Sequence, residues 1–246
     1  MFDIACGDCM NWLKTLPEGS IDLVLTDPPF GRTNAAWDTA PDYAALFREV
    51  WRVLKPNGAA VFSSMFPIAC DLVQASRKEF RYDLVWEKTT TTGFLNANRM
   101  PLRSHELLLV FYRKLPVYHP QFSEGLPYFK RREVGKASSL YGPKVMENGT
   151  YSGRRFPKSV LTFPHDKDRP NTKVSVFHPT QKPQSLLKYL IETYTNPGDT
   201  VLDPFMGSGS TGVAALATGR NFIGYELDKT FFETARKRLG EEHDRL

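Results

Sequence analysis

Apolar and polar residues alternate along most of the chain in a pattern that predicts short strands separated by amphipathic helices. Strands are expected at residues 2–5, 21–25, 59–62, 82–86, 106–112, 200–203 and 221–225. Helices are expected at residues 9–16, 42–54, 67–80, 183–194, 210–218 and 228–239. Strands that alternate with helices form βαβ units, so the pattern predicts an α/β fold with a doubly wound, mainly parallel sheet.

Two segments lack this periodicity. Residues 88–104 are mostly polar with Gly and Pro, which predicts a mobile loop. Residues 115–174 are rich in Pro, Gly, Tyr, Lys and Arg and hold only short apolar pieces, which indicates an irregular insertion and not a second core. The chain is therefore divided into a first half at 1–114, the insertion at 115–174 and a second half at 175–246.

Composition narrows the class of protein. With 246 residues, 41% of them hydrophobic and 24% charged, the chain is globular, which excludes disordered and fibrous proteins. It has no apolar stretch of about 18 residues and no signal peptide, so we expect a cytoplasmic protein. The chain has three cysteines, Cys6, Cys9 and Cys70, too few for a disulfide framework or a four-ligand zinc site. Cys6 and Cys9 are interpreted as small residues at the end of a strand, with a redox pair as the less favoured alternative.

Positive charge is concentrated in the insertion. The net charge is +5, and residues 115–173 contain eleven Lys or Arg against five Asp or Glu. This asymmetry favours a polyanionic partner met through one region, with an ordinary solvated basic surface as the alternative.

The stretch TDPPF at residues 26–30 ends a buried strand abruptly. Neither Pro28 nor Pro29 can donate a sheet hydrogen bond, so the chain must leave the sheet there. Asp27 precedes a proline and is held extended, which gives a rigid hook carrying an acid, carbonyl acceptors and the ring of Phe30. A plain turn at the end of a strand is the alternative.

A glycine array lies between a predicted strand and a predicted helix near the C-terminus. Gly207, Gly209 and Gly212 have the spacing G-x-G-x-x-G, and Glu226 ends the next strand. Glycines at a helix start let the backbone approach a nucleotide, and the acid binds ribose hydroxyls, so a nucleotide site is favoured over a tight turn. NAD, FAD and S-adenosyl-L-methionine all remain open as ligands. The hook at residues 26–30 and the glycine array each follow a strand, and in a parallel sheet such loops share one edge. We therefore expect Asp27 and the glycine loop to be neighbours there.

TDPPF, HPTQKP at residues 178–183 and DPFMGSGST at residues 203–211, in this order around the basic insertion, resemble the beta group of amino-methylating DNA methyltransferases. The resemblance implies a Rossmann-like methyltransferase fold with circularly permuted motifs. It also implies methyl transfer from S-adenosyl-L-methionine to a base flipped out of DNA, without a metal. Asp27 favours the N6 group of adenine, since N4-cytosine members more often have serine there.

The resemblance also implies roles for matching residues. The catalytic hook is Asp27, Pro28, Pro29 and Phe30. The cofactor would be bound by Asp8, Cys9, Thr180, Lys182, Asp203, Phe205, Gly207, Gly209, Ser210, Thr211 and Glu226. Thr180 and Lys182 could equally cap the helix that follows. Candidate DNA contacts in the insertion are Lys130, Arg131, Arg132, Arg154, Arg155 and Lys158.

The expected partner is double-stranded DNA, and the resemblance leaves open a homodimer and a cognate restriction endonuclease. Four alternatives to adenine methylation remain. They are N4-cytosine methylation, methylation of RNA or a protein amide, an NAD-dependent oxidoreductase, and a DNA-binding module without activity. The last leaves Asp8, Asp27 and Glu226 without a purpose.

Overall fold

The computed structural model describes residues 1–31, 38–130, 149–166 and 181–245. The chain divides into two compact units, one made of Met1–His119 with Ser159–Leu246 and the other of Pro120–Lys158.

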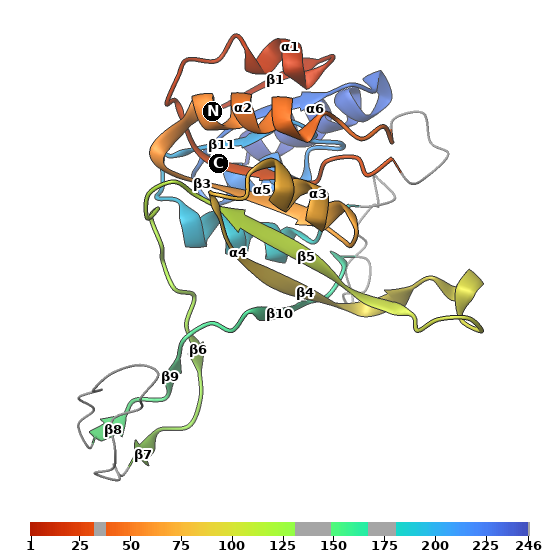
Figure 1. Ribbon diagram of the computed structural model, residues 1–246. Helices are drawn as coiled ribbons and strands as arrows, with labels where there is room; N and C mark the ends of the chain where they lie inside the picture. Colours follow the sequence, from red (N-terminus) through yellow and green to blue (C-terminus); the bar gives the residue numbers. More distant parts are fainter. Residues whose placement is uncertain (32–37, 131–148, 167–180, 246) are drawn as a thin grey trace. The chain divides into compact units, whose positions relative to one another are not determined.

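An eight-stranded sheet forms the centre of the first unit (Figure 1). In spatial order its strands are β1 (Phe2–Cys6), β12 (Asn221–Glu226), β11 (Thr200–Asp203), β2 (Ile21–Thr26), β3 (Leu54–Ser64), β5 (Arg103–Phe111), β4 (Phe80–Thr92) and β10 (Val160–Phe163). β5 is antiparallel to both of its neighbours, and the other neighbouring pairs are parallel. The predicted α/β fold with a mainly parallel sheet is confirmed.

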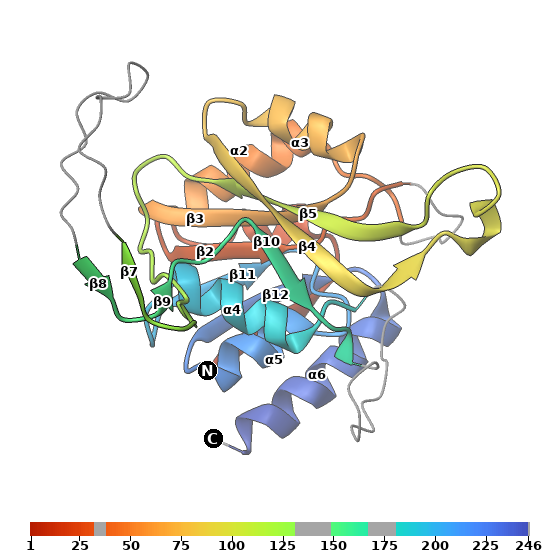
Figure 2. The same ribbon diagram turned by 90° about the horizontal axis from the view of Figure 1, so that it is seen from below.

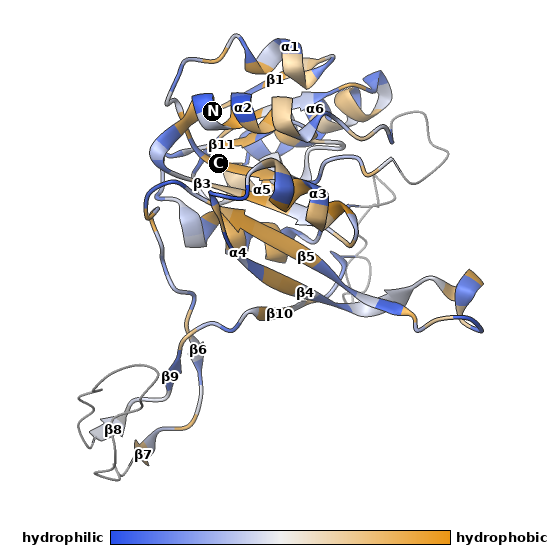
Figure 3. Ribbon diagram, viewed as in Figure 1, coloured by the Kyte–Doolittle hydropathy of each residue, from blue (hydrophilic) through white to orange (hydrophobic). Residues whose placement is uncertain are grey.

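Helices cover both faces of this sheet (Figures 1 and 2). One face carries α1 (Cys9–Leu13), α2 (Tyr43–Val53) and α3 (Ile68–Ala75), and the other carries α4 (Gln184–Tyr194), α5 (Ser210–Ala217) and α6 (Lys229–His243). Successive residues of a strand point to opposite faces. Accordingly, Leu23 and Leu25 pack with α4–α6 while Val24 packs with α1–α3. The central strand β2 is therefore apolar on both sides. Figure 3 shows apolar residues along β5 and in the middle of β4.

The structure corrects two predicted boundaries. Pro56-Asn57-Gly58, expected to separate a helix from a strand, lies inside β3, which begins directly after α2. The pairing of β2 with β3 shifts register between Ile21 and Leu23, and this irregularity accommodates the proline. The loop predicted at 88–104 is also too long, since β4 continues to Thr92, which pairs with Arg103 of β5. A short 3-10 helix (Phe94–Asn96) connects the two strands.

The second unit consists of two short antiparallel ribbons. β6 (Ser123–Glu124) pairs with β9 (Arg154–Arg155), and β7 (Tyr128–Lys130) pairs with β8 (Gly149–Tyr151). Gly153 has φ +99°, and a Cβ there would lie 2.1 Å from the Gly125 carbonyl oxygen, so this approach requires glycine. The unit spans fewer residues than the insertion predicted at 115–174, since β10 belongs to the large sheet. In the part of the chain that is described, no helix is long and apolar enough to cross a membrane.

Candidate catalytic and cofactor site

The hook starts where β2 ends. Thr26 is the last residue of the strand, and the prolines that follow Asp27 carry the chain out of the sheet. Asp38 holds the far side of the hook, because its Oδ1 accepts hydrogen bonds from the backbone N–H groups of Phe30, at 2.8 Å, and Gly31, at 2.9 Å. The ring of Phe30 is half-buried against the α1–α3 core. Asp38 was not predicted, because no sequence pattern marks an acid that accepts hydrogen bonds from backbone N–H groups.

Hydrogen bonds join the hook to the glycine loop. β2 and β11 are neighbours in the sheet, and the hydroxyl of Thr26 donates to Oδ1 of Asp203 at 2.6 Å. The same oxygen accepts the backbone N–H of Phe205 at 3.1 Å. The prediction that the hook and the glycine loop are neighbours is therefore confirmed, although 177 residues separate Thr26 from Asp203.

Asp203 is almost fully buried, and it binds both elements. Burial raises its pKa to about 6, against the opposing effect of hydrogen bonds from Thr26, Thr211 and Phe205. Its carboxylate therefore fixes the relative position of the two loops, in addition to any contact it makes with a cofactor.

The glycine loop bends into α5 through positive φ angles. Gly207 has φ +54° and Gly209 has φ +80°, which glycine adopts without strain. Gly212 serves close packing instead, because a Cβ there would lie 2.6 Å from the side chains of Leu239 and Phe222. The glycine array thus brings α5 against α6 and β12, as close packing of a nucleotide-binding helix requires.

Side chains from two helices hold the start of α5. The guanidinium of Arg238 on α6 donates to the Ser208 carbonyl at 2.5 Å and lies 3.2 Å from the Ser210 hydroxyl. The side-chain amide of Gln184 on α4 donates to the Ser210 carbonyl at 2.9 Å. These contacts fix the first turn of α5 before any ligand binds.

Glu226 and Asp8 lie at the ends of adjacent strands. The two oxygens of Glu226 accept the backbone N–H groups of Gly207, at 2.9 Å, and Asp228, at 2.8 Å. Burial raises the pKa of Glu226. β1 pairs with β12, and the Gly7 N–H donates to the Glu226 carbonyl, which sets Asp8 beside it. Asp8 also caps α1, since its Oδ1 accepts the Met10 N–H at 2.9 Å.

Cys9, next to Asp8, is a buried thiol. Burial and the charge of Asp8 raise its pKa to about 12, so it stays protonated at neutral pH. Cys6, Cys9 and Cys70 are all free thiols.

Four alternating charges converge on the hook. The ammonium of Lys182, just before α4, lies 2.5 Å from Asp27 Oδ2 and 3.1 Å from Glu106 Oε2. The other oxygen of Glu106 pairs with the ammonium of Lys88. Lys182 is predicted from the sequence as a cofactor residue. Glu106 and Lys88 were not predicted, because their meeting depends on the pairing of β5 with β4.

The charges shift one another's protonation. Burial raises the pKa of Asp27, and the nearby ammonium of Lys182 opposes this rise. Burial would raise the pKa of Glu106 too, but Lys182 and Lys88 outweigh it and lower that pKa to about 2. Burial acts to lower the pKa of Lys182, yet Asp27 and Glu106 raise it well above its ordinary value. Glu106 is therefore a carboxylate and Lys182 an ammonium near neutral pH.

Candidate DNA-binding residues lie in the second unit. The Arg154 guanidinium lies 3.9 Å from the ring centroid of Phe122, and its side chain is exposed. Arg155 stacks over Tyr128 and donates to the Leu126 carbonyl at 2.8 Å, so part of its bonding capacity is used within the unit. Lys158 is exposed. Lys130 ends β7, whereas Arg131, Arg132 and Thr180 fall outside the described residues.

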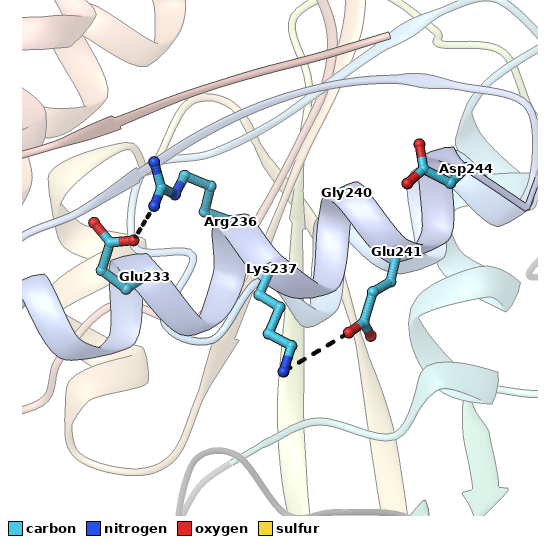
Figure 4. Close-up of a pocket in the computed structure, with 6 residues that line it drawn as sticks. All are labelled: Glu233, Arg236, Lys237, Gly240, Glu241 and Asp244. Atoms are coloured by element: carbon cyan, nitrogen blue, oxygen red, sulfur yellow. Dashed lines mark ion pairs between the residues drawn. The ribbon is translucent and has the colours of Figure 1, made fainter.

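A shallow depression on the outer surface of α6 holds none of the predicted site residues (Figure 4). Its walls are formed by α6 and its C-terminal cap, including the exposed ion pairs Arg236–Glu233 and Lys237–Glu241. Charged side chains of a single helix make a solvated surface, and we assign no function to it. The described residues contain no group of His, Cys, Asp or Glu arranged to hold a metal.

Comparison with known proteins gives concordant matches. Residues 21–237 match the family model N6_N4_Mtase, described as DNA methylase. The type II methyltransferase M.HinfI of Haemophilus influenzae is 30% identical over a 263-residue alignment that covers 96% of this chain and 67% of the relative. The DNA adenine methyltransferase YhdJ of Escherichia coli strain K12 is 30% identical over 244 residues, 95% of this chain and 81% of the relative.

Solved structures resemble the fold over nearly the whole chain. The crystal structure of the M1.HpyAVI-SAM complex matches with a TM-score of 0.62 and 25% identity, covering 97% of this chain and 100% of that one. The cytosine-N4-specific PvuII DNA methyltransferase matches with a TM-score of 0.69 and 18% identity, covering 99% of this chain and 92% of that one. The second match is a likeness of fold alone.

Proposed function

The chain belongs to the DNA methylase family described above, and we propose that it transfers a methyl group from S-adenosyl-L-methionine to the N6 amino group of adenine in double-stranded DNA. Family membership rests on a match over residues 21–237. The residue roles rest on the geometry of the hook, and the choice of adenine rests on the identity of Asp27 and on a named relative.

One observation supports the assignment of the hook. Oδ2 of Asp27 is occupied by the Lys182 ammonium, while Oδ1 is buried and has no hydrogen-bond partner among the described residues. A buried acceptor without a partner is costly unless a ligand supplies the donor. An exocyclic amino group is such a donor, so Oδ1 is the atom we assign to the target base.

The hook makes a poor nucleophile reactive. The lone pair of an exocyclic amino nitrogen is conjugated into the base. When Asp27 Oδ1 and the Pro28 carbonyl accept its two N–H groups, the nitrogen becomes pyramidal and its lone pair points toward the methyl group. A new N–C bond would form as the S–C bond breaks and S-adenosyl-L-homocysteine leaves. The surplus proton of the nitrogen would pass to its hydrogen-bond acceptor, Asp27 Oδ1, and from there to water. The hook contributes by positioning and electrostatic stabilisation.

Phe30 serves the base that enters the hook. A base must leave the duplex before it can reach Asp27, at a cost of a few kcal/mol. The ring of Phe30 is half-buried, and Asp38 holds the backbone N–H of this residue. The ring would stack on the flipped base and offset part of that cost.

The residues at the neighbouring strand ends fit the methyl donor. S-adenosyl-L-methionine supplies an electrophilic methyl group on a positively charged sulfur. Asp8 and Glu226 are carboxylates at the ends of β1 and β12, suited to the amino and hydroxyl donors of a nucleoside. Phe205, Gly207, Gly209, Ser210 and Thr211 line the turn into α5, and Asp27 brings negative charge near the sulfonium.

Adenine is favoured over cytosine as the target. The acid of the hook is aspartate, and the Escherichia coli relative with 30% identity is named a DNA adenine methyltransferase. The cytosine-N4-specific PvuII enzyme resembles this chain in fold at 18% identity, which carries no substrate assignment.

The second unit and the family suggest further partners. Exposed Arg154 and Lys158 are suited to phosphate contacts, with Lys130, Arg131, Arg132 and Arg155 as further candidates from the sequence. The name of the Haemophilus influenzae relative, a type II methyltransferase, suggests a cognate restriction endonuclease. A homodimer is a separate proposal that sedimentation velocity of the purified protein tests.

Modification-sensitive sequencing tests the proposed function. DNA from cells expressing the wild type should carry N6-methyladenine in one sequence context, and DNA from cells expressing Asp27→Ala should carry none. N4-methylcytosine at the site would correct the target base. Unmodified DNA with methylated RNA or protein would reject the substrate, and tight binding of NAD by titration calorimetry would reject the cofactor.

A further inference from the structure

The charged cluster Lys88–Glu106–Lys182–Asp27, hereafter the charge chain, ends on the catalytic hook and is drawn from four separate elements. Lys88 lies on β4, Glu106 on β5, Lys182 just before α4 and Asp27 after β2. The side chains of Lys88, Lys182 and Glu106 are only 7%, 10% and 11% exposed. Chain segments up to 155 residues apart are thus brought together around one carboxylate.

A buried ion cluster is expensive to form, so its presence needs a reason. Removing charges from water is offset only when each one is paired closely, and apolar residues of similar size often stabilise a protein equally well. Here Lys88, Glu106 and Lys182 each contact at least one group of opposite charge. Lys88 contacts one oxygen of Glu106, and Lys182 lies between the other oxygen and Asp27 Oδ2. Asp27 Oδ1 is left without a partner among the described residues.

We propose that Lys182 is a positioning residue for methyl transfer, which engages Asp27 Oδ2 so that Oδ1 alone faces the target amino group, and that Glu106 and Lys88 hold Lys182 in place. This inference rests on the proposed function, because it assigns an orientation to the acid of the hook. A free carboxylate could rotate and offer either oxygen. With one oxygen bound at 2.5 Å, the other has a defined direction.

The charge chain also sets the protonation of the hook. Asp27 must be ionised to accept an N–H of the amino group, and burial works against ionisation. The charged groups that face it are Lys182 and Lys88, which favour the carboxylate, and Glu106 and Asp203, which oppose it. Lys182 is the nearest of these groups, so it has the largest favourable effect on the ionised form.

Opposite pH shifts in two variants distinguish this role from simple support of the fold. Lys182→Gln removes the favourable charge and so raises the pKa of Asp27. The acid limb of the pH profile, where the single-turnover rate falls as the pH drops, should therefore move to higher pH by about 1–3 units. The rate should recover at pH values above the shifted limb. Glu106→Gln removes an opposing charge, so its acid limb should stay in place or move to lower pH. Lys182→Arg keeps the charge and should keep the limb of the wild type.

The experiment measures single-turnover methyl transfer to DNA between pH 5 and 9 with the full-length chain at saturating S-adenosyl-L-methionine. Lys237→Gln is the matched control, because it removes an ammonium from the exposed Lys237–Glu241 pair on α6. Binding of S-adenosyl-L-methionine to each variant, measured by titration calorimetry, should stay within about twofold of the wild type if Lys182 acts through Asp27.

Each outcome separates the hypotheses. The Gln amide can still donate to Asp27 Oδ2, so Lys182→Gln removes the charge and keeps a donor. An acid limb that stays at the wild-type pH in this variant would therefore overturn the proposed effect of Lys182 on Asp27, as would a selective loss of cofactor affinity. If Lys182→Gln does not fold, the acid limb of Glu106→Gln decides. A limb at higher pH than that of the wild type overturns the role proposed for Lys182, and an unshifted limb or one at lower pH supports it. If the wild type methylates no DNA at any pH, the proposed function itself has failed.

Discussion

Replacing Asp203 by Asn should change how the stability of the protein depends on pH. Burial raises the pKa of Asp203 from its ordinary 3.8 to about 6, and the side chain is 3% exposed. Because the folded-state pKa lies above the unfolded value, the folded state binds the proton more tightly. The resulting stabilisation is full below about pH 3.8 and is lost as the pH rises through about 6.

The size of the effect follows from the shift. A pKa difference of about 2 units corresponds to about 3 kcal/mol in the free energy of unfolding, of which about 1.3 kcal/mol falls between pH 5 and 7. The asparagine of the variant cannot titrate, but its amide oxygen can still accept from the Thr26 hydroxyl and the Phe205 N–H. The variant should therefore lack this component of the pH dependence while it keeps the link between the hook and the glycine loop.

Urea unfolding of both proteins at half-unit steps from pH 5 to 7.5 measures this difference. The free energy of unfolding of the wild type should fall relative to that of Asp203→Asn by about 1.3 kcal/mol over this range. A difference between the two proteins that does not change with pH would refute the assignment of a raised pKa. A change in the opposite direction would mean that Asp203 is stabilised as a carboxylate by its hydrogen bonds.

Three further predictions concern the cofactor loop and the second unit. Gly212→Ala should destabilise the protein by about 1–3 kcal/mol in urea unfolding, because the new Cβ would lie 2.6 Å from Leu239 and Phe222. The control Gly240→Ala, whose Cβ would have nothing within 4 Å, should not be destabilised, and an equal loss of stability in the two variants would contradict the packing role. Glu226→Gln should weaken S-adenosyl-L-methionine binding about tenfold or more in titration calorimetry, since it loses a charged acceptor beside Gly207, and should leave the rate at saturation nearly unchanged; unchanged affinity would remove Glu226 from the cofactor site. Arg154→Gln should lower the slope of log affinity for DNA against log salt by about 1 in fluorescence anisotropy, whereas Lys237→Gln should keep the slope of the wild type; equal slopes for Arg154→Gln and the wild type would mean that Arg154 contacts no phosphate.

Local patterns predict most of the catalytic framework. The prolines of TDPPF end β2 where expected, and the glycine array begins α5 at Ser210. Their proximity follows from the sequence as well, since both loops leave parallel strands at the same sheet edge. The neighbours β2 and β11 confirm this, as does the hydrogen bond between Thr26 and Asp203.

The rest of the site depends on contacts that sequence patterns do not encode. Lys88 lies in a polar, threonine-rich run of β4 that has no apolar alternation, so the pattern predicts that the strand ends before it. β-branched threonines favour an extended strand even without an apolar face. The pattern places Glu106 in a strand, but its meeting with Lys88 and Lys182 requires the antiparallel pairing of β4 with β5 and the approach of the segment before α4.

The direct test of the catalytic hook is the single-turnover rate of methyl transfer by Asp27→Asn, with duplex DNA and saturating S-adenosyl-L-methionine. Lys182 would retain the amide oxygen, which leaves an NH2 donor where Oδ1 would accept the target amino group. We expect a rate loss of about 10²–10³-fold or more, with the affinity for S-adenosyl-L-methionine within about twofold of the wild type. A rate near that of the wild type would contradict the assignment of Asp27 as the acceptor of the target amino group.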